Sequence, residues 1–151
     1  MITVEVAKPA QFPTLLEVWE SSVRATHFFL REQDIQELRS TLLNEYFPNL
    51  NIRVARLCSN GLIVGFTGVS ENRIEMLFVN AEQRGQGIGK LLLRHAIDIQ
   101  GADELDVNEQ NPQAVIFYKK NGFVITGRSE LDGQGRQYPL LHMKLLKTLS
   151  C

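Results

Sequence analysis

The sequence contains little cysteine. Its 151 residues include two, Cys58 and Cys151, which provide neither a disulfide framework nor the ligand spacing of a metal site. The three histidines are scattered along the chain and do not suggest a metal site either. At this length folding removes about 68–70% of the unfolded chain's surface from water, so a core can form without disulfides or metals. We therefore predict a single domain over residues 1–151, in a reducing compartment and without a metal.

An excess of charge of either sign is also missing. Lys and Arg total 16 against 17 for Asp and Glu, which gives a formal net charge of −1. A protein that binds nucleic acid by neutralising phosphates needs a basic excess or a basic run. The sequence therefore predicts no nucleic-acid partner.

The chain has no long apolar run. Crossing a bilayer takes about 18 or more consecutive apolar residues, and none of its apolar stretches approaches that length. The first residues, 1–6, alternate apolar and polar side chains, which is not the pattern of a signal peptide. With 44% hydrophobic and 22% charged residues, the composition is that of a globular domain. We expect a soluble, cytoplasmic protein without a membrane partner, either a monomer or a homodimer.

The spacing of apolar residues predicts strands and helices in the order β-α-α-β-β-β-α-β-α-β-β. This order is typical of an α/β or α+β domain with a parallel crossover in its second half. The expected segments are, in chain order, residues 2–6, 12–23, 35–46, 51–57, 62–69, 73–79, 88–99, 104–108, 111–122, 123–130 and 137–146.

Local signals predict several turns and faces. Asn60-Gly61 indicates a two-residue hairpin, because both residues tolerate a positive φ. Pro48 is expected to end the second helix, and Asn111-Pro112 and Gly122 to bound the last one. Along 73–79, alternation predicts two faces, Glu75, Leu77 and Val79 on one and Ile74, Met76 and Phe78 on the other. The helix over 88–99 is expected to turn one side inward, formed by Ile88, Leu91, Leu92, Ala96 and Ile99.

The most informative segment is the glycine-rich run from Arg84 to Lys90, where a predicted strand passes into a predicted helix. Gly85, Gly87 and Gly89 have no Cβ and so let backbone N–H groups approach a ligand, and a helix N-terminus attracts anions. These features suit a phosphate or pyrophosphate, although such glycines can also serve only tight strand–helix packing. The run does not fit a P-loop, because Arg84 and Leu91 stand where that motif has glycine and serine or threonine. It does not fit a Rossmann fingerprint, because Lys90 or Leu92 stands where that motif needs glycine or a small residue.

Two motifs together resemble the GNAT superfamily of N-acetyltransferases. Residues 84–89, Arg-Gly-Gln-Gly-Ile-Gly, match its R/Q-x-x-G-x-G/A signature, and residues 111–123 match its N-x-x-A-x-x-x-Y-x-x-x-G-F pattern. The segments 26–30 and 127–141 resemble those of small, single-domain bacterial members. The resemblance implies a mixed, mostly antiparallel sheet, flanked by helices, with a splayed central parallel pair formed by strands 73–79 and 104–108.

The resemblance also implies where acetyl-CoA binds. In the family the cosubstrate lies in the wedge between the two splayed strands. The backbone of one strand pairs with the pantetheine arm, the glycine-rich loop holds the pyrophosphate, and the last helix contacts the arm and the sulfur. The residues implied here are Leu77, Phe78 and Val79 for the arm, Arg84, Gly85, Gln86, Gly87, Ile88, Gly89 and Lys90 for the pyrophosphate, and Asn111 and Tyr118 on the last helix.

The resemblance implies direct attack of a primary amine on the thioester. Tyr118 is the expected acid for the departing sulfur, because a phenol is protonated at neutral pH, and Glu75 is the candidate base, acting through water. Asn108 and Asp106 could order that water, and His27 lies in the loop that shapes the acceptor site in the family.

Several alternatives stay open at this point. Tyr118 could belong to the core, Glu75 could be a solvated strand residue, and His27 could have no role. His95 is expected on the exposed flank of its helix, and His142 has no evident partner. The chain could also be a non-catalytic acyl-CoA sensor instead of an enzyme. The acceptor, whether a protein N-terminus, a lysine, a polyamine, an amino acid or an antibiotic, is not readable from the sequence.

Overall fold

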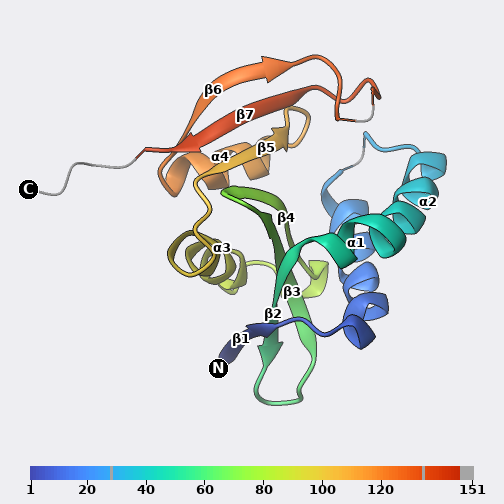
Figure 1. The fold of residues 1–151 in the computed structure, drawn as a ribbon, viewed down its shortest axis with the longest axis vertical. Helices are drawn as coiled ribbons and strands as arrows, with labels where there is room; N and C mark the ends of the chain where they lie inside the picture. Colours follow the sequence, from blue (N-terminus) through green and yellow to red (C-terminus); the bar gives the residue numbers. More distant parts are fainter. Residues whose placement is uncertain (28, 134, 147–151) are drawn as a thin grey trace, which may run out of the picture. The chain divides into compact units, whose positions relative to one another are not determined.

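The computed structural model describes residues 1–27, 29–133 and 135–146, and Phe28, Gln134 and Cys151 lie outside them. The chain divides into two compact units, one over Met1–Ala102 and one from Asp103 onward. The single-domain organisation expected from the sequence stays a prediction. The predicted order of strands and helices is confirmed (Figure 1). Among the described residues, no helix is both long enough and apolar enough to cross a membrane.

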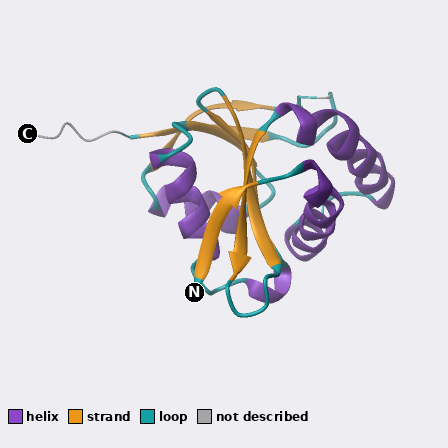
Figure 2. Cartoon of the chain, turned by 60° about the horizontal axis from the view of Figure 1, so that its bottom comes forward, coloured by secondary structure: helices purple, strands orange, loops and turns teal. Residues whose placement is uncertain are grey.

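The first unit is an antiparallel sheet with helices on both faces (Figure 2). Its strands pair in the order β1-β2-β3-β4, with Ile2 opposite Leu57 and Ser70 opposite Arg73. Helices α1 and α3 both contact strands β3 and β4. The bounds are β1 Ile2–Val6, α1 Phe12–Thr26, α2 Glu32–Thr41, β2 Asn51–Leu57, β3 Ile63–Ser70, β4 Arg73–Val79 and α3 Ile88–Asp98.

Strand β3 shows why the sheet needs a helix on each face. Its residues 64–69 are all buried, so both faces of the strand are covered. Gly65 allows α3 to pack closely, because a Cβ there would lie 2.9 Å from Leu92 Cδ1 and 2.9 Å from the Phe78 carbonyl oxygen. A larger residue at position 65 would therefore push α3 off the sheet.

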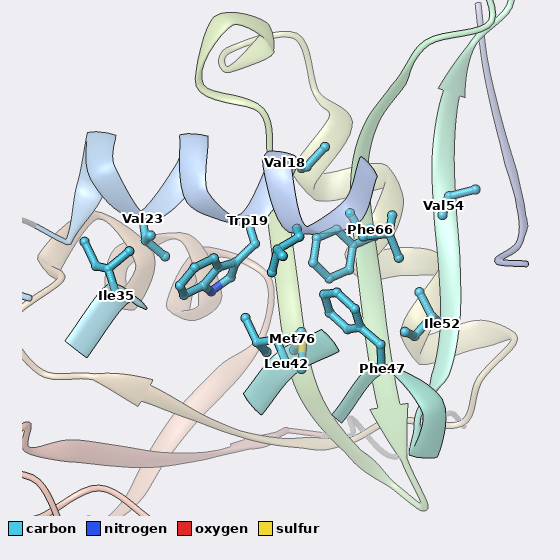
Figure 3. Close-up of a cluster of buried hydrophobic side chains, with 12 residues drawn as sticks. Val18, Trp19, Val23, Ile35, Leu42, Phe47, Ile52, Val54, Phe66 and Met76 are labelled. Carbon is cyan, nitrogen blue, oxygen red and sulfur yellow. The ribbon is translucent and has the colours of Figure 1, made fainter. Parts of the chain in front are cut away.

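The larger core cluster lies between the sheet and the early helices (Figure 3). Trp19 from α1 is 4% exposed, and Phe66 from β3 is fully buried. Phe47, from a short 3₁₀ turn, meets Phe66 edge-on, with ring centroids 5.8 Å apart at 89°. Burying each such side chain contributes about 1.5–3 kcal/mol. Pro48 lies inside this turn, so it does not simply end the second helix, which continues past Thr41 as a π-helical segment over Leu42–Tyr46.

The smaller core cluster joins α3 to the sheet, and it corrects the predicted helix face. Ile88, Leu92 and Ala96 are buried as expected, but Leu91 is 40% and Ile99 62% exposed. Leu93, which the prediction omitted, is 1% exposed. At about 100° per residue, Ile88, Leu92 and Ala96 share one face of the helix. Leu93 lies beyond one edge of that face, and Leu91 lies beyond the opposite edge. Ile99 follows the last helical residue.

The second unit is a three-stranded antiparallel sheet with one helix. Its strands pair in the order β5-β7-β6, and a bulge between Ile125 and Gly127 shifts the β6–β7 register. Helix α4 contacts β5 and β6. The Asn111 side chain accepts a hydrogen bond from the Ala114 N–H at 3.3 Å, and Gly122 follows with φ +95°, so both predicted ends are confirmed. The bounds are β5 Glu104–Asn108, α4 Pro112–Lys120, β6 Phe123–Ser129 and β7 Leu140–Leu145.

The predicted Asn60-Gly61 hairpin turn is wrong in its geometry. Strands β2 and β3 are joined by residues 58–62, with Gly61 at φ +73°, and the Asn60 side chain accepts from the Leu62 N–H. The tight two-residue turn instead joins β3 to β4, where Glu71 has φ +55°. The side chain of Asn60 thus stabilises the turn by hydrogen bonding instead of by a positive φ.

Candidate active site

The glycine-rich run forms an open helix start. Gly87 precedes α3 in a left-handed conformation, φ +80° and ψ +6°, and no side chain among the described residues caps the helix. Gly85 also has a positive φ, +82°, and no atom from elsewhere in the described part of the chain lies within 4 Å of the Cβ position of either glycine. The first turn of a helix leaves N–H groups without intrahelical partners. These N–H groups can therefore receive anionic oxygens, and the binding of a pyrophosphate there stays a prediction.

The segment before this helix start, residues 80–82, is held in place by hydrogen bonds within the first unit. The Ala81 N–H donates to Ser21 Oγ on α1 at 3.1 Å, and the Glu82 N–H donates to the Asn80 side chain at 2.9 Å. Arg84 and Lys90, on either side of the two glycines, are exposed. The backbone is thus fixed ahead of the turn, while two cationic side chains stay accessible to an anion.

His27 closes α1 and is held in one tautomer. Thr26 Oγ1 gives its only proton to the Ser22 carbonyl oxygen at 2.8 Å. The same oxygen lies 2.7 Å from His27 Nδ1, so Nδ1 must donate and Nε2 keeps its lone pair. Burial, and secondly the positive charge of Arg84, lowers the pKa of His27 to about 4. His27 is therefore a neutral hydrogen-bond acceptor at neutral pH.

Aromatic rings surround His27. Its ring centroid lies 5.2 Å from that of Phe29 and 6.5 Å from that of Phe78 on β4. Phe78 belongs to the strand predicted to hold the pantetheine arm, and Arg84 belongs to the glycine-rich run. The structure thus brings His27 together with two predicted cosubstrate residues.

Glu75 is the extra residue of a β-bulge. Ile74 and Met76 pair with consecutive residues of β3, Val69 and Gly68, so the register of strand pairing passes over Glu75. The predicted faces of β4 are confirmed for four residues: Met76 and Phe78 pack with the larger core cluster, and Leu77 and Val79 pack with the smaller. Glu75 itself is exposed. Bulges turn side chains out of the regular pleat, often beside active sites.

Tyr118 lies in the core of the second unit. It is 9% exposed and packs edge-on against Phe117 and Phe123, with centroid distances of 5.2 and 5.9 Å. Burial raises the pKa of the phenol above its ordinary value. The core alternative is thus supported, but a residue in the core can still present its protonated hydroxyl to a ligand. A raised pKa makes Tyr118 a hydrogen-bond donor over the whole neutral range.

The two asparagines near the end of β5 are used differently. Asn111 is 7% exposed and its side-chain oxygen caps α4, so it is fixed by the fold. Asn108 Oδ1 is buried and has no hydrogen-bond partner among the described residues. A buried acceptor without a donor costs about 1–3 kcal/mol, and a bound amide or amine N–H could supply that donor.

His142 has two partners that were not evident from the sequence. Its Nδ1 lies 2.6 Å from Asp106 Oδ1, and its Nε2 lies 2.7 Å from Ser129 Oγ. His95 is also not on an exposed flank: it is half-buried, and its Nε2 lies 3.1 Å from Arg53 Nη1. Both pairings join residues distant in the chain, so no local motif announces them. Within the described residues, no group of three or more His, Cys, Asp or Glu side chains could hold a metal.

Comparison with known proteins gives the family and several relatives. A family model described as an acetyltransferase (GNAT) domain matches residues 27–147. The chain is similar to the peptidyl-lysine N-acetyltransferase YjaB of Salmonella typhimurium, with 40% identity over 95% of this chain and 97% of that protein. The protein of the same name from Escherichia coli is 38% identical, over 95% of this chain and 96% of its own length.

Solved structures agree. The solution structure of apo-form YjaB from Escherichia coli superposes with a TM-score of 0.86 at 37% identity, over 98% of this chain and 99% of that one. The PaiA N-acetyltransferase of Thermoplasma acidophilum, solved in complex with coenzyme A, shares the fold at a TM-score of 0.75 and 22% identity, over 97% and 99% of the two chains. The fold class expected from the sequence, a mixed and mostly antiparallel GNAT-like α/β fold, is confirmed.

Proposed function

Because this chain belongs to the GNAT family of acetyltransferases and transfers an acetyl group to an amine, we propose that the amine is a lysine side chain of a protein. One observation carries this proposal. Two relatives named peptidyl-lysine N-acetyltransferase are 40% and 38% identical, each over 95% of this chain. The same similarity favours an enzyme over a non-catalytic acyl-CoA sensor.

The cosubstrate in this proposal is acetyl-CoA, bound through the open start of α3. The N–H groups that follow Gly87 receive the pyrophosphate oxygens, since neither Gly85 nor Gly87 puts a Cβ in their way. Arg84 and Lys90 add positive charge. The backbone of β4 at Leu77, Phe78 and Val79 holds the pantetheine arm, and Gln86, Ile88, Gly89 and Asn111 complete the set.

The acceptor must arrive as a free amine, because a lysine ammonium, with an ordinary pKa near 10.4, has no lone pair to attack with. Glu75, which the bulge turns outward, takes that proton through water. Each unit offers one acceptor for an amine N–H group: the neutral Nε2 of His27 in the first unit and the buried Oδ1 of Asn108 in the second. A backbone N–H of β4 stabilises the oxyanion that forms on the thioester carbonyl.

Tyr118 acts on the departing sulfur. A thiol has an ordinary pKa near 8.5, and burial holds the pKa of this phenol above its own ordinary value of about 10. Full proton transfer from the phenol to the thiolate is therefore uphill. Tyr118 instead donates a strong hydrogen bond that stabilises the thiolate as it forms. A cytoplasmic location and a monomeric or dimeric state remain part of the proposal.

A panel of amines tests the acceptor. Thiol release from acetyl-CoA is measured with a lysine peptide blocked at its α-amine, the same peptide with lysine replaced by arginine, a polyamine and a free amino acid. The proposal expects turnover with the lysine peptide and background release with its arginine counterpart. Turnover confined to the polyamine or to α-amines would overturn the lysine assignment while leaving acetyl transfer intact.

A further inference from the structure

Three polar side chains of the second unit form a continuous hydrogen-bonded chain. Asp106 comes from β5, His142 from β7 and Ser129 from the end of β6. Asp106 Oδ1 lies 2.6 Å from His142 Nδ1, and His142 Nε2 lies 2.7 Å from Ser129 Oγ. All three belong to one compact unit, so their arrangement is fixed within it.

The strand register places these groups on one face. Asp106 pairs directly with His142 across β5 and β7, and Gly127 pairs with His142 across β7 and β6. Ser129 follows two residues after Gly127 and therefore shares its face. A Cβ at position 127 would lie 3.3 Å from His142 Cδ2, closer than side chains normally pack. The absence of a side chain at Gly127 thus lets the imidazole lie across β6 and reach Ser129.

The protons in this chain can be assigned from chemistry. An ionised carboxylate only accepts hydrogen bonds, so a neutral His142 carries its proton on Nδ1 and donates it to Asp106. Nε2 then holds a lone pair, and the Ser129 hydroxyl donates to it. A serine whose proton is already directed at an oriented imidazole is an activated nucleophile.

The hydrogen-bonded network of Asp106, His142 and Ser129 is also accessible to solvent. The side chains of His142 and Asp106 are 35% and 31% exposed, and Ser129 is half-buried. Water can fill the hydrogen-bonding capacity of side chains this exposed. The folded state therefore does not require His142 to have partners on two other strands. Acyl transfer to serine needs an imidazole that is held in one tautomer between a carboxylate and the serine hydroxyl, as in this network.

We propose that Ser129 is a nucleophile that accepts acyl groups from activated esters and thioesters, an activity separate from acetyl transfer to an amine. Ser129 Oγ bonds to the carbonyl carbon as its proton passes to His142 Nε2. The bond from that carbon to the leaving oxygen or sulfur breaks, and the leaving group takes the proton from His142. Water then bonds to the acyl carbon as its proton passes to His142 Nε2. The bond from that carbon to Ser129 Oγ breaks, Oγ takes the proton back from His142, and the carboxylic acid leaves.

Two probes test the proposal on the full chain without any amine acceptor. A fluorophosphonate reports an activated serine covalently, with the labelled residue located by peptide mass spectrometry, and p-nitrophenyl acetate reports ester turnover. Cys58 and Cys151 are replaced by alanine in every sample, because thiolates also react with the ester. Ser129→Ala removes the nucleophile, Asp106→Asn removes the carboxylate, and Thr126→Ala is the matched control. Thr126 is a neighbouring hydroxyl on β6 that donates to the His142 backbone oxygen at 3.3 Å and not, among the described residues, to its imidazole.

The expected result is labelling at Ser129 that Thr126→Ala leaves unchanged and Asp106→Asn slows by about 10²–10⁴-fold, the usual worth of a positioned base. Ester turnover should fall to background in Ser129→Ala. If Asp106→Asn does not fold, Gly127→Ala replaces it, because its Cβ displaces the imidazole and should slow labelling at least tenfold. Absent labelling of Ser129, or labelling that neither variant slows, overturns the proposal. The network of Asp106, His142 and Ser129 would then serve only to stabilise the fold.

Discussion

Replacing Gly87 by alanine separates backbone strain from ligand binding at the start of α3. Gly87 has φ +80° and ψ +6°, which an L-residue adopts at a cost of roughly 1–2 kcal/mol. No non-neighbouring atom of residues 1–27, 29–133 and 135–146 lies within 4 Å of the new Cβ, so packing against these residues adds no further cost. For a chain of this size each kcal/mol lowers the melting temperature by about 2–4 °C. The variant should therefore melt about 2–8 °C lower than the wild type without ligand.

The same methyl group should interfere with the cosubstrate. In the wild type, coenzyme A at 100 times its Kd stabilises the fold by about 2.7 kcal/mol. Gly87→Ala should lose most of this stabilisation, because the Cβ stands where a phosphate oxygen approaches the N–H groups. Thermal melts with and without coenzyme A, together with calorimetric titration, measure both effects.

Gly61→Ala is the matched control for this experiment. Gly61 has φ +73°, and its Cβ position is equally open among the residues that the structure describes, but it belongs to the loop between β2 and β3. Its substitution should cause a similar loss of stability and keep the full coenzyme A shift. Equal ligand shifts in the wild type and Gly87→Ala would refute the placement of the pyrophosphate, and a lost shift in Gly61→Ala would show that strain alone abolishes binding.

Three further substitutions test the remaining roles. Tyr118→Phe should lower kcat by about 10²–10³-fold, the usual effect of removing one hydrogen-bond donor to a developing charge, with little change in coenzyme A affinity or melting temperature. Unchanged kcat in thiol-release kinetics would assign the residue to the core. Glu75→Gln should cost most activity at low pH and progressively less as the free amine becomes abundant, and a deficit that is constant with pH would leave Glu75 only a positional role. The pKa of His27 lies at about 4 when folded against 6.5 ordinarily, so between these values the unfolded chain binds the extra proton and stability falls as the pH drops. That loss amounts to at most about 3 kcal/mol, and denaturant melts of His27→Gln should lack it; an identical pH dependence in the variant would contradict the burial of a neutral His27.

Features encoded locally were predictable from the sequence. The ends of α4 follow from Asn111 and Gly122, whose side chain and positive φ act within a few residues of the helix. The open start of α3 follows equally from Gly85 and Gly87. These positions need no tertiary information, because a cap or a glycine acts on its own neighbours in the chain.

Features set by strand register were not predictable. The partners of His142 depend on the pairing of β7 with two strands and on the bulge before Gly127. The outward position of Glu75 depends on a second bulge, which alternation along one strand cannot reveal. The turns at Asn60 and Glu71 were not predictable for the same reason. A tight hairpin turn could have formed at either place, and strand pairing decided that it formed at Glu71. A one-residue shift in register changes the neighbours of every side chain.

The most direct test of lysine acetylation is a competition within one peptide. A peptide with a free α-amine and a single lysine is incubated with acetyl-CoA and the protein, and fragment mass spectrometry locates the acetyl group. The account predicts acetyl transfer to the lysine Nζ, which is reduced in Gly87→Ala and retained in Gly61→Ala. Acetylation of the α-amine alone, or no acetylation above the rate without protein, would contradict it.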